Sequence, residues 1–369
     1  MSDRQSPGSL RAMRSAYMQW AKERSQSRFN LATSGVLSCT PGDIHWKLED
    51  LSLSRPGGYG YGPLQEAIAK HCGVAVENVV AADGTSMANF LAMAALVRPG
   101  DEVLVELPAY ELLLAALGFL EADVRRFVRT AESGFTLDPA LVERVVSSRT
   151  RLIVVTNLHN PSSAFTSEET LRSIGAIARR VGARVLVDEV YLDAAFELAP
   201  RSAFCLGPEF VCTNSLTKVY GLSGLRCGWV LAEPDLARRM WLLNDLFGVN
   251  QPHPAEQLSV RAFAHLGTIR ERSRALLERN REILNRFLAQ RTDLAVRPLE
   301  FGTTAFPRLL SGSMEHFAEL FRNKHAGTVA PGSFFDMPEH FRIGIGIETE
   351  ALEQSLQRLG AALDEFRKR

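Results

Sequence analysis

This chain of 369 residues has few cysteines, no excess of either charge and no long apolar run. No apolar run approaches the length of a membrane span, and the polar N-terminus lacks the apolar core of a signal peptide. Basic and acidic residues number 42 each, so no overall field favours nucleic acid or an anionic membrane as a partner. The five cysteines include no Cys-x-x-Cys pair, which argues against a zinc site or disulfide framework and favours a reducing cytoplasm.

Short apolar runs alternate with helical stretches from Val79 onward. Such alternation indicates an α/β fold with a mostly parallel sheet covered on both faces, in which ligands bind at the carboxyl ends of the strands. The expected strands are 79–82, 103–105, 152–156, 184–187, 210–212 and 228–231, with helices at 64–71, 87–97 and 168–181. Further along, helices at 236–246, 255–288, 314–324 and 348–366 and strands at 294–296, 304–309 and 341–345 indicate a smaller α+β domain.

The connection Asn214–Trp229 carries a lysine and an arginine among glycines between two apolar strands. Lys218, in such surroundings, is a candidate amine of depressed pKa that condenses with carbonyl groups. Ser215 and Arg226 could hold an anion, because the guanidinium fork suits phosphate. The alternative is an exposed loop lysine among turn glycines.

Two other glycine- and serine-based motifs are weaker. Ser215-x-x-Lys218 also occurs in serine acylases, but these need Ser-Asp-Asn and Lys-Thr-Gly, and the chain has neither. The stretch Pro56–Pro63 is glycine-rich without being Gly-x-Gly-x-x-Gly, so it is no dinucleotide fingerprint. Gly84-Thr85-Ser86, by contrast, precedes a helix and offers backbone N–H groups and hydroxyls to an anion.

These residues together resemble the fold-type I pyridoxal-phosphate enzymes of the class I/II aminotransferase group, from about Asn30 to the C-terminus. The resemblance depends on the order and spacing of Asn160-Pro161, Asp188-Glu189-Val190-Tyr191 and Ser215-x-x-Lys218, with Arg226 eight residues later. It implies pyridoxal 5'-phosphate as cofactor and a large domain whose mostly parallel seven-stranded sheet lies between helices. The expected divisions are an N-terminal segment 1–50 packing on the small domain, a large cofactor domain 51–255 and a small domain 256–369.

The resemblance gives each strand-end residue a role towards the cofactor ring. Lys218 resembles the Schiff-base lysine that also moves the proton, and Asp188 the carboxylate that keeps the pyridine nitrogen protonated. Tyr191 and Asn160 resemble the pair that binds the phenolic oxygen, and Tyr110 resembles the stacked aromatic. Taken singly, Asp188 could be a helix N-cap, Asn160 a turn residue and the tyrosines core packing.

The resemblance also implies sites for the two anionic groups of cofactor and substrate. The predicted phosphate site consists of Thr85, Ser86, Ser215 and Arg226, with Tyr59 reaching it from a second subunit and Tyr61 as the rival for that role. Arg342 resembles the arginine that clamps the substrate α-carboxylate, with Asn160 and the Gly35 backbone beside it. Its alternative is a surface arginine on an edge strand.

The sequence leaves the reaction open. Ser162-Ser163 follows Asn160-Pro161 where the family usually has Thr/Ser and Gly, and His159 precedes it. We expect an aminotransferase that passes an amino group from an L-amino acid to a 2-oxo acid within a homodimer that shares its active sites. The alternatives are a lyase or cyclase (C-S lyase, ACC-synthase-like or capreomycidine-synthase-like) and a regulatory domain without turnover. Apolar residues at Leu37, Leu107 and Phe247 favour a neutral or apolar substrate.

Overall fold

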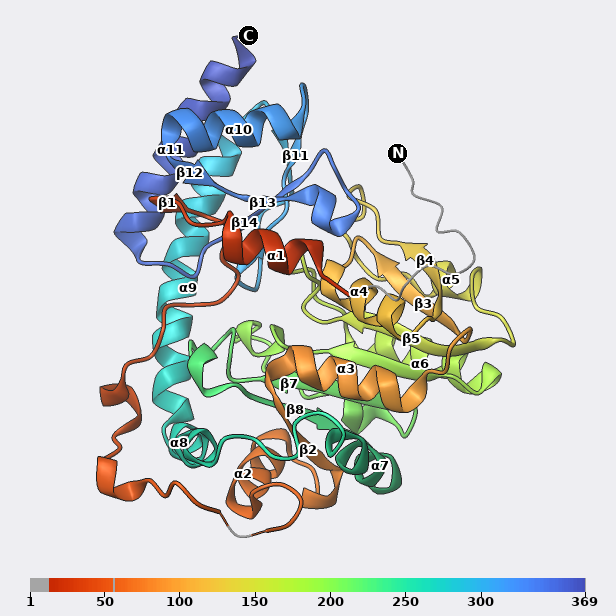
Figure 1. The fold of residues 1–369 in the computed structure, drawn as a ribbon. Coiled ribbons are helices and arrows are strands. Elements are labelled where there is room, and N and C mark those ends of the chain that lie inside the picture. Colours follow the sequence, from red (N-terminus) through yellow and green to blue (C-terminus); the bar gives the residue numbers. More distant parts are fainter. Residues whose placement is uncertain (1–12, 56, 369) are drawn as a thin grey trace.

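The computed structural model describes residues 13–55 and 57–368 (Figure 1). Its centre is a seven-stranded sheet of order β2-β8-β7-β6-β5-β3-β4, parallel except where β8 pairs with β2 and β7. The strands are β2 Val79–Asp83, β3 Glu102–Leu107, β4 Asp123–Val128, β5 Thr150–Thr156, β6 Arg184–Asp188, β7 Phe210–Ser215 and β8 Cys227–Leu231. The predicted α/β fold with a mostly parallel sheet is confirmed.

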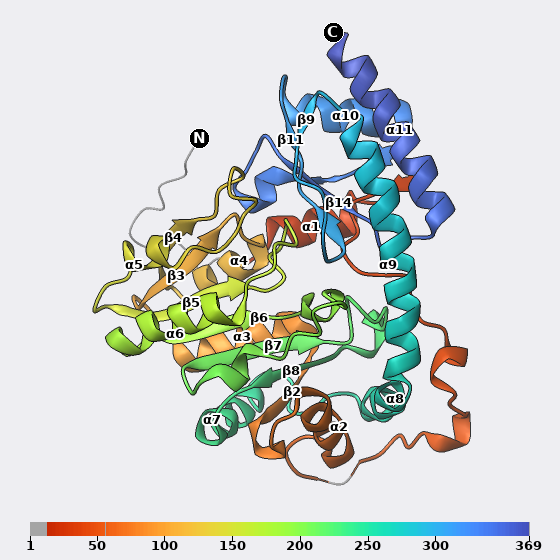
Figure 2. The same ribbon diagram turned by 180° about the vertical axis from the view of Figure 1, so that it is seen from behind.

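Helices cover both faces of this sheet, with α3 and α6 on opposite sides (Figures 1 and 2). The helices of this part are α2 Gly62–Cys72, α3 Gly84–Leu96, α4 Glu111–Phe119, α5 Pro139–Glu143, α6 Glu168–Val181, α7 Pro234–Asn244 and α8 His253–Ala264. The predicted limits of α6 are confirmed, and a cap at each end of the helix accounts for them. Ser167 accepts the N–H of Thr170 at the start, and Gly182 takes the left-handed conformation at the end.

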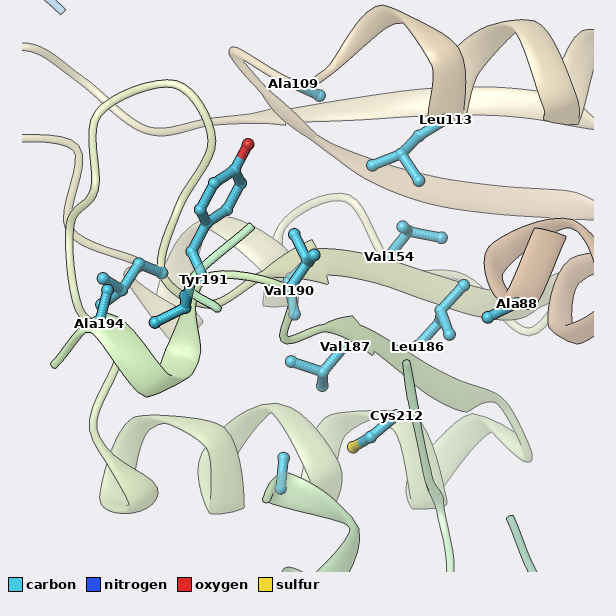
Figure 3. Packing of buried hydrophobic residues seen from close by; sticks show 14 of the residues in the cluster. Ala88, Ala109, Leu113, Val154, Leu186, Val187, Val190, Tyr191, Ala194 and Cys212 are labelled. Atoms are coloured by element: carbon cyan, nitrogen blue, oxygen red, sulfur yellow. The ribbon is translucent and has the colours of Figure 1, made fainter. Parts of the chain in front are cut away.

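The central strands are apolar on both faces, as a sheet between two helical layers requires. Val154, Leu186 and Val187 are fully or almost fully buried, and Figure 3 shows them in one cluster with residues of the neighbouring helices and strands. Tyr191 belongs to the same cluster just beyond the end of β6. The packed core therefore fixes the strand end from which site residues project.

A second group of elements lies beyond the sheet and is joined to it by the 24-residue helix α9 (Figures 1 and 2). The buried Asn280 of α9 donates from Nδ2 to the carbonyl oxygens of Ile345 and Ile347, both at 2.7 Å, just after β14. The elements are α9 Leu266–Ala289, α10 Met314–His325, α11 Thr349–Arg367, β9 Leu294–Ala295, β10 Thr304–Ala305, β11 Arg308–Leu309, β12 Gly327–Thr328, β13 Ala330–Pro331 and β14 Phe341–Gly344.

The N-terminal residues contribute α1 (Ala16–Glu23) and β1 (Phe29–Asn30), and β1 pairs with β12 in parallel. The spacing of Met13, Tyr17 and Trp20 predicts a helix from Leu10 to about Arg24, and the expected start at Leu10 lies outside the described residues. The division of the chain at residues 51 and 256 stays a prediction. None of the described helices is long and apolar enough to cross a membrane.

Two sequence predictions in the C-terminal half are wrong in detail. The single helix expected at 255–288 is two helices, α8 and α9, which separate at His265. The strand expected at 304–309 is interrupted at Phe306-Pro307, because proline lacks the N–H that a continuous ladder needs. At both places the apolar pattern of the sequence continues, so the pattern alone does not indicate that the helix or strand ends there.

Candidate active site

A cavity of about 410 Å³ lies where the sheet strands end, as the rule for parallel sheets predicts. Most of the predicted site residues line it, from helix starts, strand ends and the β7–β8 connection. They are Gly35, Thr85, Ser86, Tyr110, Asn160, Asp188, Tyr191, Lys218, Arg226 and Arg342. Leu37, Leu107 and Phe247, which had favoured an apolar substrate, do not line the cavity.

Lys218 is half-buried and its amine donates to Ser34 Oγ at 3.0 Å. Burial lowers the pKa of this amine, because the charged form loses its hydration. The alternative of an exposed loop lysine is therefore wrong. An amine whose pKa is lowered is neutral more often and is a better nucleophile towards a carbonyl carbon.

Asp188, the last residue of β6, lines the cavity, and burial raises the pKa of its carboxyl group to about 6. Asn89 of α3 donates from Nδ2 to Asp188 Oδ2 at 2.8 Å and accepts at Oδ1 from Thr213 Oγ1 at 2.6 Å. The sequence reasoning missed Asn89. Its signal is its place one helical turn after the Thr85-Ser86 anion motif, on the face that turns back to the sheet.

Two aromatic residues flank the strand ends. Tyr191 is buried and pairs with Ser34, and burial raises the pKa of its hydroxyl. Tyr110 is half-buried at the start of α4, where its hydroxyl donates to Met18 Sδ at 3.2 Å. Both rings line the cavity, so the reading of them as core packing alone is wrong.

The predicted anion site forms at the N-terminus of the 13-residue helix α3. Thr85 Oγ1 lies 2.8 Å from Ser215 Oγ, which places Ser215 directly behind the cavity wall. Arg226 donates from Nη2 to Asp83 O at 2.9 Å, and it has no carboxylate partner among the described residues. Gly84 has a φ of +73°, and a Cβ there would lie 2.4 Å from Arg226 Nη2. Free helix N–H groups, hydroxyls and an arginine suit a phosphate dianion.

Arg342 is 1% exposed and forms no ion pair with a carboxylate in the described part of the chain. Its Nη1 donates to Asn160 Oδ1 at 2.9 Å, and its Nε is buried without a partner. The alternative of a surface arginine is wrong. A buried guanidinium that lacks a counter-anion is strongly suited to bind one.

A buried ion pair supports Asn160 from behind. Glu106 lies 2.8 Å from Arg129, and both side chains are fully buried. Glu106 Oε1 accepts from the backbone N–H and the hydroxyl of Thr156, at 2.8 and 2.6 Å. Thr156 Oγ1 in turn accepts the N–H of Asn160 at 2.9 Å. This chain of hydrogen bonds runs from the end of β3 to Arg342 and fixes the loop after β5.

The unusual residues around Asn160-Pro161 have defined partners. His159 Nε2 lies 3.0 Å from the Pro108 carbonyl and must donate to it, so Nδ1 accepts from Ser162 Oγ at 2.6 Å. Burial lowers the pKa of His159 well below its usual value, which keeps the ring neutral. Ser163 Oγ donates to Thr304 O at 2.8 Å. Ser163 thus joins the loop to β10 and His159 joins it to Pro108, while none of the three residues lines the cavity.

Tyr59 lies outside the cavity of its own chain. It is 43% exposed, and its hydroxyl donates to Asp245 Oδ2 at 3.3 Å. Its rival Tyr61 packs against His253, with ring centroids 4.8 Å apart. Neither tyrosine reaches the anion site within one chain, so a role in a second subunit stays a prediction for Tyr59.

Comparisons with known proteins found a matching family, similar sequences and similar structures. The model of the family "Aminotransferase class I and II" matches residues 53–359. Capreomycidine synthase from Streptomyces vinaceus is 28% identical over 93% of this chain and 92% of its own. An arginine–pyruvate transaminase from Pseudomonas aeruginosa is 26% identical over 79% and 76%. The structure of a PLP-dependent aminotransferase from Streptococcus suis superposes with a TM-score of 0.89, at 27% identity and over 97% and 99% of the chains.

Proposed function

The chain belongs to the class I and II aminotransferase family, and we propose on that basis that it transfers the amino group of an L-amino acid to a 2-oxo acid. Its cofactor is pyridoxal 5'-phosphate, as in its relatives. The convergence of Lys218 and Arg342 on one cavity carries the proposal. A half-buried amine of lowered pKa and a buried guanidinium without a counter-anion suit a substrate that has both an amino group and a carboxylate.

The residues present fit the cofactor. Thr85, Ser86 and Arg226, with Ser215 behind them, would hold its phosphate at the N-terminus of α3. The raised pKa of Asp188 marks a buried carboxylate that gains from a positively charged partner such as a protonated ring nitrogen.

Each protein group then has a task at a stated atom. The bound cofactor supplies an electron sink for the negative charge that develops at the substrate Cα. Lys218 would hold the cofactor's aldehyde carbon and carry the proton to and from the substrate Cα. Asn160 and Tyr191 would hold the phenolic oxygen, while Arg342 orients the substrate through its carboxylate. Asn89 keeps Asp188 in place through the bond to Oδ2.

The residues that line the cavity favour an amino donor whose side chain is uncharged. Asp188 is the one carboxylate among the residues that line it, and its basic residues all have tasks in the mechanism. The wall contributed by α1 and the following residues consists of Tyr17, Met18, Trp20 and small or neutral residues. A substrate with an apolar or aromatic side chain would bury that side chain there without stranding a charge.

A cyclase or lyase is the second candidate, because capreomycidine synthase covers 93% of the chain at 28% identity. An absorbance spectrum of the purified protein separates the two. A yellow band that bleaches when an amino acid is added without a 2-oxo acid supports the first half of transamination and names the donor. A persistent band with release of ammonia or a cyclic product supports the second candidate. Absence of the band after incubation with pyridoxal phosphate contradicts both.

We also propose a cytoplasmic homodimer in which Tyr59 reaches the partner's phosphate site. Tyr59 is exposed, and Leu246, Phe247 and Val249 near it expose at least half of their surface. All five cysteines are free. The test mixes Lys218→Ala and Tyr59→Phe chains. If Tyr59 acts in trans, each heterodimer holds one complete site and regains tight cofactor binding there. If it acts within its own chain, mixing restores nothing.

A further inference from the structure

The guanidinium of Arg342 is enclosed by residues from three distant parts of the chain. Asn160 accepts from Nη1, and the Ala32 carbonyl accepts from Nη2 at 3.3 Å. Nη2 also donates to the hydroxyl of Tyr17, on α1, at 2.8 Å. The rings of Tyr17 and Phe335 lie 5.6 and 5.1 Å from the guanidinium carbon, close enough for cation–π attraction. Every one of these partners is neutral.

Tyr17 itself faces the cavity from a helix whose start is anchored. It is 8% exposed, and its ring packs edge-on against that of Tyr110, with centroids 5.2 Å apart. Glu111 binds the first turn of α1 by accepting from Ser15 Oγ and from the N–H of Ala16, the latter at 3.1 Å. A carboxylate at that position also complements the positive end of the helix dipole. The tyrosine is thus held over Arg342 by helix packing.

The hydroxyl of Tyr17 can donate one further hydrogen bond. It accepts one hydrogen bond from Arg342, and no acceptor is assigned to its own proton among residues 13–55 and 57–368. A phenol can accept and donate at once. Within the same cavity, an anion that approached Arg342 would meet both the guanidinium and this proton.

We propose that Tyr17 is a substrate-binding residue that completes the carboxylate site. Its oxygen accepts from Arg342 Nη2, and its proton is donated to the substrate α-carboxylate. The proposal rests on the proposed function in one respect, namely that the substrate is an amino acid. It adds to that function a specific donor beside Arg342, supplied by α1.

The decisive experiment measures binding of 3-phenylpropanoate and of its uncharged amide to the cofactor-loaded enzyme. This probe has a carboxylate and no amine, so it cannot react, whichever reaction the enzyme catalyses. Trp20, whose ring lies 6.1 Å from that of Tyr17, reports binding by its fluorescence. The expected result is tighter binding of the carboxylate than of the amide, and a loss of about tenfold or more for the carboxylate alone in Tyr17→Phe, because a hydrogen bond to a charged group is removed.

Gln19→Ala is the matched control. Gln19 lies on the same helix and is exposed, so this variant should bind both probes as the wild type does. The absorbance of bound cofactor in Tyr17→Phe should match the wild type, which shows that the variant is folded and loaded. Kinetics with an amino donor should then show a raised KM and an almost unchanged kcat, the pattern of lost ground-state binding.

The possible failures are distinguishable. Equal carboxylate affinities for the wild type and Tyr17→Phe overturn the role of Tyr17 and leave the proposed function intact. Equal affinities of the wild type for the carboxylate and the amide show that Arg342 binds no carboxylate, which overturns the proposed function itself. If Tyr17→Phe lowers the affinity for both the carboxylate and the amide, Tyr17 contributes only to the shape of the cavity, and this result also refutes the proposal.

Discussion

Replacing Asp188 by asparagine should stabilise the cofactor-free protein while it weakens cofactor binding. Burial raises the pKa of Asp188 from 3.8 to about 6. A carboxyl group whose folded pKa is raised binds more protons when folded than when unfolded between these two values, so the free energy of unfolding falls as pH rises through that window. Above about pH 6 the full cost of the buried charge is present. At about 1.4 kcal/mol per pKa unit, it amounts to about 3 kcal/mol at pH 7 and about half of that at pH 5.

The assay is urea unfolding of both cofactor-free proteins at a series of pH values from 5 to 8. Burial also raises the pKa of Glu189, to about 7. Because Glu189 is present in both proteins, its contribution to the free energy of unfolding cancels in the difference between them. Asp188→Asn should be the more stable by a margin that grows between pH 5 and 7 and then levels off. A difference that does not vary with pH would show that the cavity solvates the carboxylate, and would refute the reasoning. Saturation with pyridoxal phosphate should reverse the order of stability, because the wild type binds the cofactor more tightly.

Three further predictions concern the same cavity. Lys218→Ala should remove the yellow band and all turnover; a variant that still forms product would contradict the mechanism. Gly84→Ala forces a side chain into a φ of +73° against the guanidinium of the anion site, so it should lower stability by about 1–2 kcal/mol and weaken phosphate binding. Gly267→Ala, with nothing within 4 Å of its Cβ, is its neutral control in thermal unfolding. Asn89→Ala removes the largest influence that lowers the pKa of Asp188, so the apoprotein should lose stability as pH rises from 5 to 8 more steeply than the wild type; an unchanged pH profile would contradict this.

Several residues that line the cavity could be predicted to converge because each follows an apolar strand. The carboxyl ends of parallel strands meet at one edge, so Asn160, Asp188 and Lys218 converge whatever the details of the helices between them. Helix α6 was equally predictable, since its caps fix both ends. Local signals were sufficient in these cases.

The residues that sequence reasoning missed act across long separations. Asn89 contacts Asp188, 99 residues later, and Tyr17 contacts Arg342, 325 residues later. Asn89 lies on the largely apolar helix α3 and Tyr17 on the amphipathic helix α1, and in both cases only tertiary packing reveals the partner. The break between α8 and α9 escaped for a related reason, because both helices continue the same apolar periodicity.

Helix α9 has a mechanical consequence for the site. At 1.5 Å per residue its 24 residues span about 36 Å, so a rotation of about 5° at one end displaces the other by about 3 Å. Asn280 ties its middle to the segment just after Arg342. Because Asn280 binds that segment, a tilt of α9 about the end that contacts α8 would also move the backbone next to Arg342.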